Sequence, residues 1–168
     1  AGLVAGAATG AGLGNKFLAH IREVDVIVQV LRDFVDSEVV KEGSVDPKSD
    51  YEVVTSELIL KDLETVMKVK EGKTLREKGM DLPAGRQGRK KEVVDKLYAG
   101  LNSGKPARTV LVGGEVELAA DLFLLTMKKE IKVLNVGEND PRLREYSGEE
   151  VVISAKIEAE LSTLAEAD

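Results

Sequence analysis

Apolar positions in the first third of the chain change from helical to strand spacing. Over residues 14–22 they recur every three or four positions, which predicts a short helix. Over residues 24–34 they occupy both alternate faces, as in a strand that is buried on both sides. Such strands are typical of the parallel sheet in an α/β protein, and Asp46-Pro47 then predicts the end of the following loop.

The middle of the chain has helical spacing that is interrupted once. Ser49 and Glu52 have the spacing of a capping box and precede a helical stripe of apolar residues. The stripe fails over residues 72–88, where glycine and proline break it, and it resumes over residues 89–101. Two helices joined by a loop predict an antiparallel hairpin, and two helices packed separately on a main body are the alternative.

The last third returns to an alternation of helices and strands. The spacing predicts a helix over residues 115–127, a strand over 131–136, and a strand over 151–154 that leads to a helix from about residue 158. Turn-forming residues fill positions 137–141. Strands that alternate with helices indicate an α/β sheet, in which ligands bind at the carboxyl ends of the strands.

Composition narrows the classes of function. A length of 168 residues fits one domain, or one domain with an insertion. The net charge of −6 argues against a generally basic nucleic-acid binder, although a local basic patch can coexist with an acidic total, and no DNA partner is expected. With no Cys and a single His, disulfides and His- or Cys-rich metal centres are excluded. The first charged residue is Lys16, and this uncharged start is too short for a membrane span, so no membrane partner is expected.

Four stretches together resemble the Obg-like ATPase (YchF) family of P-loop nucleotide hydrolases, and they occur in the order of the family. They are the glycine-rich residues 1–18, which resemble switch II; residues 45–64, which resemble the start of an inserted helical domain; residues 124–138; and residues 154–161. The resemblance implies a partial P-loop α/β sheet with an inserted α-helical hairpin. It divides the chain into residues 1–48, an inserted helical domain at 49–127, and residues 128–168 with the base-recognition loops.

The same resemblance implies a nucleotide site. In related GTPases the base loop is Asn-Lys-x-Asp, whereas this chain has Asn135, Val136, Gly137 and Glu138. The longer Glu would misplace the carboxylate that meets guanine, and the resemblance to the family implies adenine instead, with Asn135 orienting the purine ring. On the other side of the base, the backbone amide near Ala155 would meet the edge of the ring. The aliphatic part of the Lys156 side chain would lie on the face of the ring. The expected base-binding residues are Asn135, Val136, Glu138, Ser154, Ala155 and Lys156. Taken alone, residues 135–138 also fit an ordinary turn.

Catalysis is implied only for a longer protein. No Gly-x-x-x-x-Gly-Lys-Ser/Thr run is present, because Met67 stands where the run ending in Gly72-Lys73-Thr74 needs its first Gly. Gly2 and Gly6 are the switch II candidates, and no metal ligand is assigned. The intact protein is expected to hydrolyse ATP with Mg²⁺, to bind ribosomal subunits and to be cytoplasmic, while this chain alone is expected to be inactive. The alternatives are a GTP-binding switch of the Obg type and a non-catalytic helical module that binds ribosomes or proteins.

Overall fold

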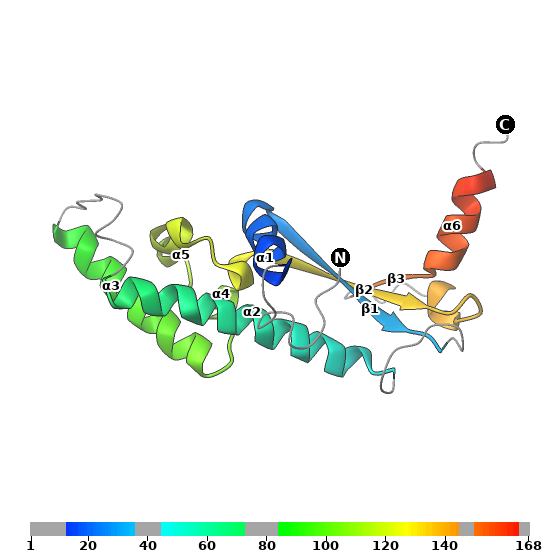
Figure 1. Cartoon of the computed structure of the whole chain (residues 1–168), viewed down its shortest axis with the longest axis horizontal. Coiled ribbons are helices and arrows are strands. Elements are labelled where there is room, and N and C mark those ends of the chain that lie inside the picture. The colour runs from blue at the N-terminus through cyan, green and yellow to red at the C-terminus, as the bar shows by residue number, and fades with distance from the viewer. Residues whose placement is uncertain (1–12, 36–44, 73–83, 145–149, 165–168) are drawn as a thin grey trace. The chain divides into compact units, whose positions relative to one another are not determined.

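The computed structural model describes residues 13–35, 45–72, 84–144 and 150–164 (Figure 1). Along the chain the elements are α1 Leu13–Glu23, β1 Val26–Asp33, α2 Pro47–Lys70, α3 Ala84–Asn102, α4 Ala107–Val110, α5 Gly114–Ala119, the 3₁₀ turns η1 Ala120–Leu122 and η2 Leu125–Met127, β2 Lys129–Val136, the 3₁₀ turn η3 Pro141–Arg144, β3 Val151–Ile153 and α6 Ala155–Leu164. The predicted α/β fold class is confirmed by these helices and strands. Gly2 and Gly6 lie outside the described residues.

Contacts divide the chain into two compact units. A sheet unit contains Val26–Glu52 and Glu130–Asp168, and a helical unit contains α1 and Val53–Lys129. The predicted boundaries at 48/49 and 127/128 remain a prediction.

Among the described residues of the sheet unit, three strands form one sheet in the order β1-β2-β3. β2 and β3 are parallel, with Val133 opposite Val151 and Asn135 opposite Ile153. On one face, Leu31, Leu134 and Val136 form a small core. Because β3 ends where α6 begins, the start of α6 lies at the same edge of the sheet as the end of β2.

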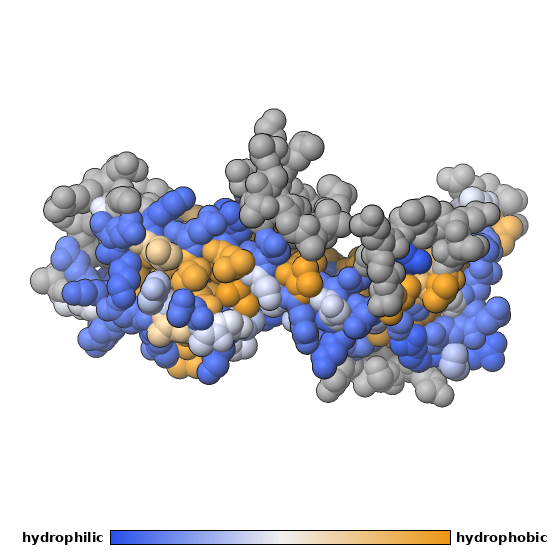
Figure 2. Space-filling view, turned by 60° about the horizontal axis from the view of Figure 1, so that its bottom comes forward, coloured by the Kyte–Doolittle hydropathy of each residue, from blue (hydrophilic) through white to orange (hydrophobic). Residues whose placement is uncertain are grey.

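The expectation that the first strand is buried on both sides is wrong for this structure. Gln29 and Leu31 are each 7% exposed, whereas Val28 and Val30 on the alternate face are 54% and 63% exposed. Valine favours a strand through its branched side chain whether or not that side chain is buried, so the pattern predicts the strand better than its burial. Figure 2 shows a face of the molecule on which hydrophobic areas are exposed among hydrophilic residues.

The two long helices share one core in the helical unit, which confirms the predicted pairing of helices. Val66 and Val69 of α2 belong to the same buried cluster as Val93 and Leu97 of α3. At the end of α2 the ammonium of Lys70 lies 2.8 Å from the Asp95 carboxylate and 4.5 Å from the centre of the Tyr98 ring. Figure 1 shows α3 returning beside α2.

Three predicted helix starts are too late. Asp46, not Ser49, caps α2: its side-chain Oδ1 accepts the Ser49 N–H at 3.0 Å, and Pro47 occupies the first helical position, where it lacks only an N–H that the helix does not use. α3 begins at Ala84 rather than residue 89. α6 begins at Ala155 rather than about residue 158.

The helix predicted over residues 115–127 is broken. α5 ends at Ala119, and after one 3₁₀ turn Phe123 adopts φ 47° and ψ 46°, a left-handed conformation that no helix continues through. Arg22 holds this bend, since its Nη1 donates to the Phe123 carbonyl at 3.0 Å. A second 3₁₀ turn then leads towards β2.

A buried carboxylate organises the segment beyond the break. Asp62 of α2 is 0% exposed, and its oxygens accept hydrogen bonds of 2.7 Å from the Leu125 N–H, the Thr126 N–H and the Thr126 hydroxyl. The same hydroxyl oxygen accepts the Ala107 N–H at 2.9 Å. Burial raises the pKa of Asp62, while the hydrogen bonds from Thr126 and Leu125 and the charge of Arg22 lower it. The network therefore fixes α4 and η2 to α2.

Candidate nucleotide base-binding site

Two of the stretches predicted to contact a base meet at the edge of the sheet. Asn135 lies one residue before the end of β2, opposite the last residue of β3. Its Oδ1 accepts the backbone N–H of Ala155 at 2.9 Å. Parallel strands bring their carboxyl ends to the same edge, so residues twenty positions apart come into direct contact. The asparagine is thus held in one orientation before any ligand arrives.

Ser154 and Ala155 form the start of α6. Ser154 is 3% exposed, and its carbonyl accepts the Glu158 N–H at 3.0 Å, the first bond of the helix. The Ala155 amide, which the sequence assigns to the ring edge, is donated to Asn135 instead. A purine that used this amide would have to displace Asn135 from it.

Val136 and Gly137 shape the wall beside Asn135. The Val136 side chain is 2% exposed and packs in the core of the sheet unit, so only its backbone is placed to meet a base. At Gly137 an added Cβ would meet nothing within 4 Å, which leaves open space at this point. A flat ring therefore has room to approach the backbone here.

Glu138 and Lys156 form an ion pair at the mouth of the site. The Lys156 Nζ and Glu138 Oε1 lie 2.5 Å apart, and the two side chains are 66% and 43% exposed. Exposed ion pairs contribute about 0–1 kcal/mol, so opening this pair to admit a ring would cost little. The ion pair therefore joins the loop after β2 to the first turn of α6 at the exposed edge of the sheet unit.

A second ionic group fixes the loop after β2 and was not predicted. Arg142 donates from Nη1 to Asp33 at the end of β1 at 2.6 Å, and from Nη2 to Asp140 at 2.7 Å. The Arg142 guanidinium lowers the pKa of Asp140 to about 2. No sequence signal pairs Asp33 with Arg142, because 109 positions separate them and neither lies in a recognisable motif.

Within 13–35, 45–72, 84–144 and 150–164 no group of three or more His, Cys, Asp or Glu side chains is placed to hold a metal ion. In the same ranges no helix is long and apolar enough to cross a membrane.

Comparison with known proteins identifies close relatives. The chain is 41% identical over 182 aligned positions to the ribosome-binding ATPase YchF of Bacillus subtilis, an alignment that covers 98% of this chain and 48% of the relative. It is 42% identical over 144 positions to the Obg-like ATPase 1 of Saccharomyces cerevisiae, covering 83% of this chain and 36% of that protein. No protein-family model matches the chain.

A solved structure agrees with the sequence relatives. The structure of a YchF GTPase from Schizosaccharomyces pombe is similar with a TM-score of 0.72 and 33% identity, and the match covers 92% of this chain and 46% of that one. This chain thus spans about half or less of the length of the relatives it matches.

Proposed function

Because this chain belongs to the YchF/Obg-like ATPase family, we propose that it carries the base-binding part of the nucleotide site of a ribosome-associated ATPase. The observation that supports this most directly is the hydrogen bond between Asn135 and the Ala155 amide. It joins the two predicted base-binding loops without help from a ligand. We further propose that residues 49–127 are a helical insertion in the nucleotide-binding domain, and that the protein acts in the cytoplasm, where ribosomes translate.

Adenine is the proposed base. A guanine site of the Asn-Lys-x-Asp type uses a carboxylate that accepts two hydrogen bonds from the ring. Glu138 has a longer side chain than Asp and its carboxylate is paired with Lys156 at 2.5 Å, so it would have to leave this ion pair to accept two hydrogen bonds from guanine. A site that leaves polar groups of the wrong base unpaired discriminates against that base. The names of the relatives differ on this point, since two are called ATPases and the solved structure is called a GTPase.

The residues of this chain bind and orient the base. Asn135 holds its orientation through the Ala155 amide, Val136 and Gly137 present backbone to the ring, and the stem of Lys156 can cover its face. Phosphoryl transfer depends on positioning the phosphates and stabilising their charge, for which the sequence has no Gly-x-x-x-x-Gly-Lys-Ser/Thr run. Mg²⁺ would neutralise phosphate charge in the intact protein, and no described residue is assigned to it. We therefore propose that this chain alone does not hydrolyse ATP.

The test is base recognition by the chain itself. Amide chemical shifts of residues 1–168 are followed by NMR during titration with adenosine and, separately, guanosine. Adenosine should shift the amides of Asn135, Ala155 and Lys156 at lower concentration than guanosine does. Asn135→Ala should abolish these shifts, whereas Ser162→Ala, a change on the exposed part of α6, should preserve them.

Two other results would point elsewhere. Stronger shifts with guanosine would overturn the choice of adenine and favour the GTP-dependent switch, which the description of the solved structure as a GTPase supports. If neither nucleoside shifts these amides, the base-site assignment is wrong, and a non-catalytic module that binds ribosomes or proteins would replace it.

A further inference from the structure

The turn that follows β2 is closed by a backbone hydrogen bond. The Asp140 N–H donates to the Gly137 carbonyl at 3.1 Å, so Glu138 and Asn139 occupy the two central positions of a four-residue turn. This turn begins directly after Val136, the last residue of β2. The position of the Glu138 side chain therefore depends on how firmly Asp140 is held.

Arg142 holds Asp140 through both carboxylate oxygens. Asp140 Oδ1 accepts the Arg142 backbone N–H and Nε, each at 2.9 Å, and Asp140 Oδ2 accepts Nη2 at 2.7 Å. This is the bidentate arrangement in which a planar guanidinium meets a carboxylate. The hydrogen bonds from Arg142 lower the pKa of Asp140 to about 2, so the carboxylate is ionised at neutral pH.

The same guanidinium joins the turn to the neighbouring strand. Arg142 Nη1 donates to Asp33 Oδ2 at 2.6 Å, and Asp33 is the last residue of β1, which lies next to β2 in the sheet. Single exposed ion pairs contribute little, whereas bidentate pairs and networks of several charges are the exception. The Asp33 and Asp140 side chains are only 24% and 18% exposed, so this bridge belongs to the second kind.

We propose that Arg142 is a positioning residue for base recognition, which bridges Asp33 and Asp140 and so keeps the turn that carries Glu138 in one place. Held there, the Glu138 carboxylate stays beside Lys156. A loosened turn would let this carboxylate move to accept hydrogen bonds from guanine, and the preference for adenine would shrink. The inference rests on the proposed base-binding function.

Loss of the bridge should leave the sheet unit folded, because Leu143 anchors the same segment independently. The Leu143 side chain packs against the core formed by Leu31, Leu134 and Val136. This apolar contact does not use the guanidinium of Arg142. Removing the guanidinium is therefore expected to change recognition of the base rather than formation of the sheet.

The experiment titrates the 168-residue chain with adenosine and, separately, guanosine, and obtains both dissociation constants from the amide chemical shifts of Asn135, Ala155 and Lys156. Arg142→Gln should weaken adenosine binding about three- to tenfold, the effect expected when one member of a coupled network is removed. Guanosine binding should change less, so the ratio of the two constants should approach one. Arg142→Lys keeps the charge without the planar fork and should recover only part of the loss.

A double-mutant cycle tests whether the bridge to β1 is the cause. Asp33→Ala removes the acceptor of Nη1 and leaves Arg142 and Asp140 unchanged. If both residues act through one bridge, the double variant Asp33→Ala with Arg142→Gln should lose no more adenosine affinity than Arg142→Gln alone. Fully additive losses would overturn the bridge.

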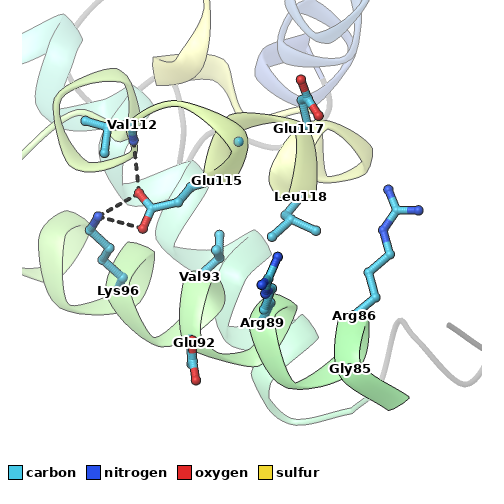
Figure 3. A pocket seen from close by; sticks show the side chains of 11 residues that line it. Gly85, Arg86, Arg89, Glu92, Val93, Lys96, Val112, Glu115, Glu117 and Leu118 are labelled. Atoms are coloured by element: carbon cyan, nitrogen blue, oxygen red, sulfur yellow. Dashed lines mark hydrogen bonds and ion pairs between the residues drawn. The ribbon is translucent and has the colours of Figure 1, made fainter. Parts of the chain in front are cut away.

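The matched control is Lys96→Gln in the helical unit. Figure 3 shows Glu115 bound both to Lys96 and to the backbone of Val112. The Lys96 Nζ lies 2.6 Å from Glu115 Oε2, and Glu115 accepts the Val112 N–H at 3.0 Å. As at Asp140, one carboxylate accepts hydrogen bonds from a cationic side chain and from a backbone N–H. Lys96→Gln removes the same charge as Arg142→Gln and should leave both dissociation constants unchanged.

The possible failures are distinguishable. If Arg142→Gln binds both nucleosides as the wild-type chain does, the positioning role is wrong and the base site stands. Equal losses for adenosine and guanosine, or a loss shared by Lys96→Gln, would also overturn the role, because a general loss of structure or of charge would then be the cause. If the wild-type chain shifts these amides with neither nucleoside, the base site itself is wrong and the role of Arg142 falls with it.

Discussion

Replacing the buried carboxyl group of Asp62 should destabilise the helical unit more than any exposed substitution in it. Asp62→Asn replaces one accepting oxygen by an NH₂ group, so a donor then faces the buried N–H of Leu125 or Thr126. Each buried donor left without an acceptor costs about 1–3 kcal/mol, and we expect a loss of about 2–3 kcal/mol in the free energy of unfolding. Asp62→Ala removes both acceptors and should cost about 3–5 kcal/mol, as when one partner of a buried charged network is deleted.

The assay is urea unfolding followed by circular dichroism at the helix band. Glu64→Gln is the control on the same helix. The Glu64 side chain is 55% exposed and, among the described residues, pairs with Lys61 alone, so the effect should stay within about 0.5 kcal/mol. If Asp62→Asn and Glu64→Gln lose equal stability at equal m-values, the Asp62 network does not hold α4 and η2 to α2, and the reasoning fails.

The pH dependence of the same comparison tests the protonation of Asp62. Because burial raises the pKa of Asp62 in the fold above its usual value of 3.8, the folded state binds this proton more tightly than the unfolded state. This contribution to stability is fully present at a pH below the pKa of Asp62 in the unfolded chain. It is lost as the pH rises through the pKa of Asp62 in the folded chain. The advantage of the wild-type chain over Asp62→Asn should therefore shrink from acid to neutral pH. An advantage that grows with pH would show that the hydrogen bonds outweigh burial.

Two further substitutions test local packing and backbone strain by the same unfolding assay. At Gly100 an added Cβ would lie 2.4 Å from Cγ2 of Val110, so Gly100→Ala should lower stability by the about 1–3 kcal/mol that overpacking costs. Gly88→Ala, on the same helix but with open space around it, should raise stability by about 0.5–1 kcal/mol. Equal effects of the two substitutions would refute the packing argument. Phe123→Gly should raise stability by about 1 kcal/mol, because the side chain is 58% exposed and its left-handed backbone costs about 1–2 kcal/mol, while Phe123→Ala keeps that strain and should bring no gain.

Periodicity predicted the existence of the main elements but not their ends. Helix ends depend on single polar contacts, such as the bond from the Ser49 N–H to Asp46, and two residues on the same loop can satisfy the same capping rule. The break at Phe123 has no local signal, since phenylalanine rarely adopts a positive φ. It is held by the long-range bond from Arg22, which only tertiary structure reveals.

The candidate base site was predicted from a resemblance, and the structure adds the contacts. The sequence placed Asn135 and Ala155 at one site, and their hydrogen bond follows from the register of β2 and β3. It did not anticipate that the Val136 side chain belongs to the core or that Arg142 joins two loops. Strand register and arginine bridges depend on residues far apart in the sequence, where local patterns carry no information.

Most of the helical unit, Val53–Lys129, follows β1 and precedes nearly all of β2 along the chain, which has a consequence for how the chain folds. These strands are neighbours in the sheet, although nearly a hundred residues separate them along the chain. During synthesis β1 therefore emerges long before β2 and has no partner strand from that segment. Within the helical unit, Leu125 packs beside Leu58 and Val54 early in α2, so folding of this unit shortens the loop that β1 and β2 must close. We expect the helical unit to fold first and the sheet to follow.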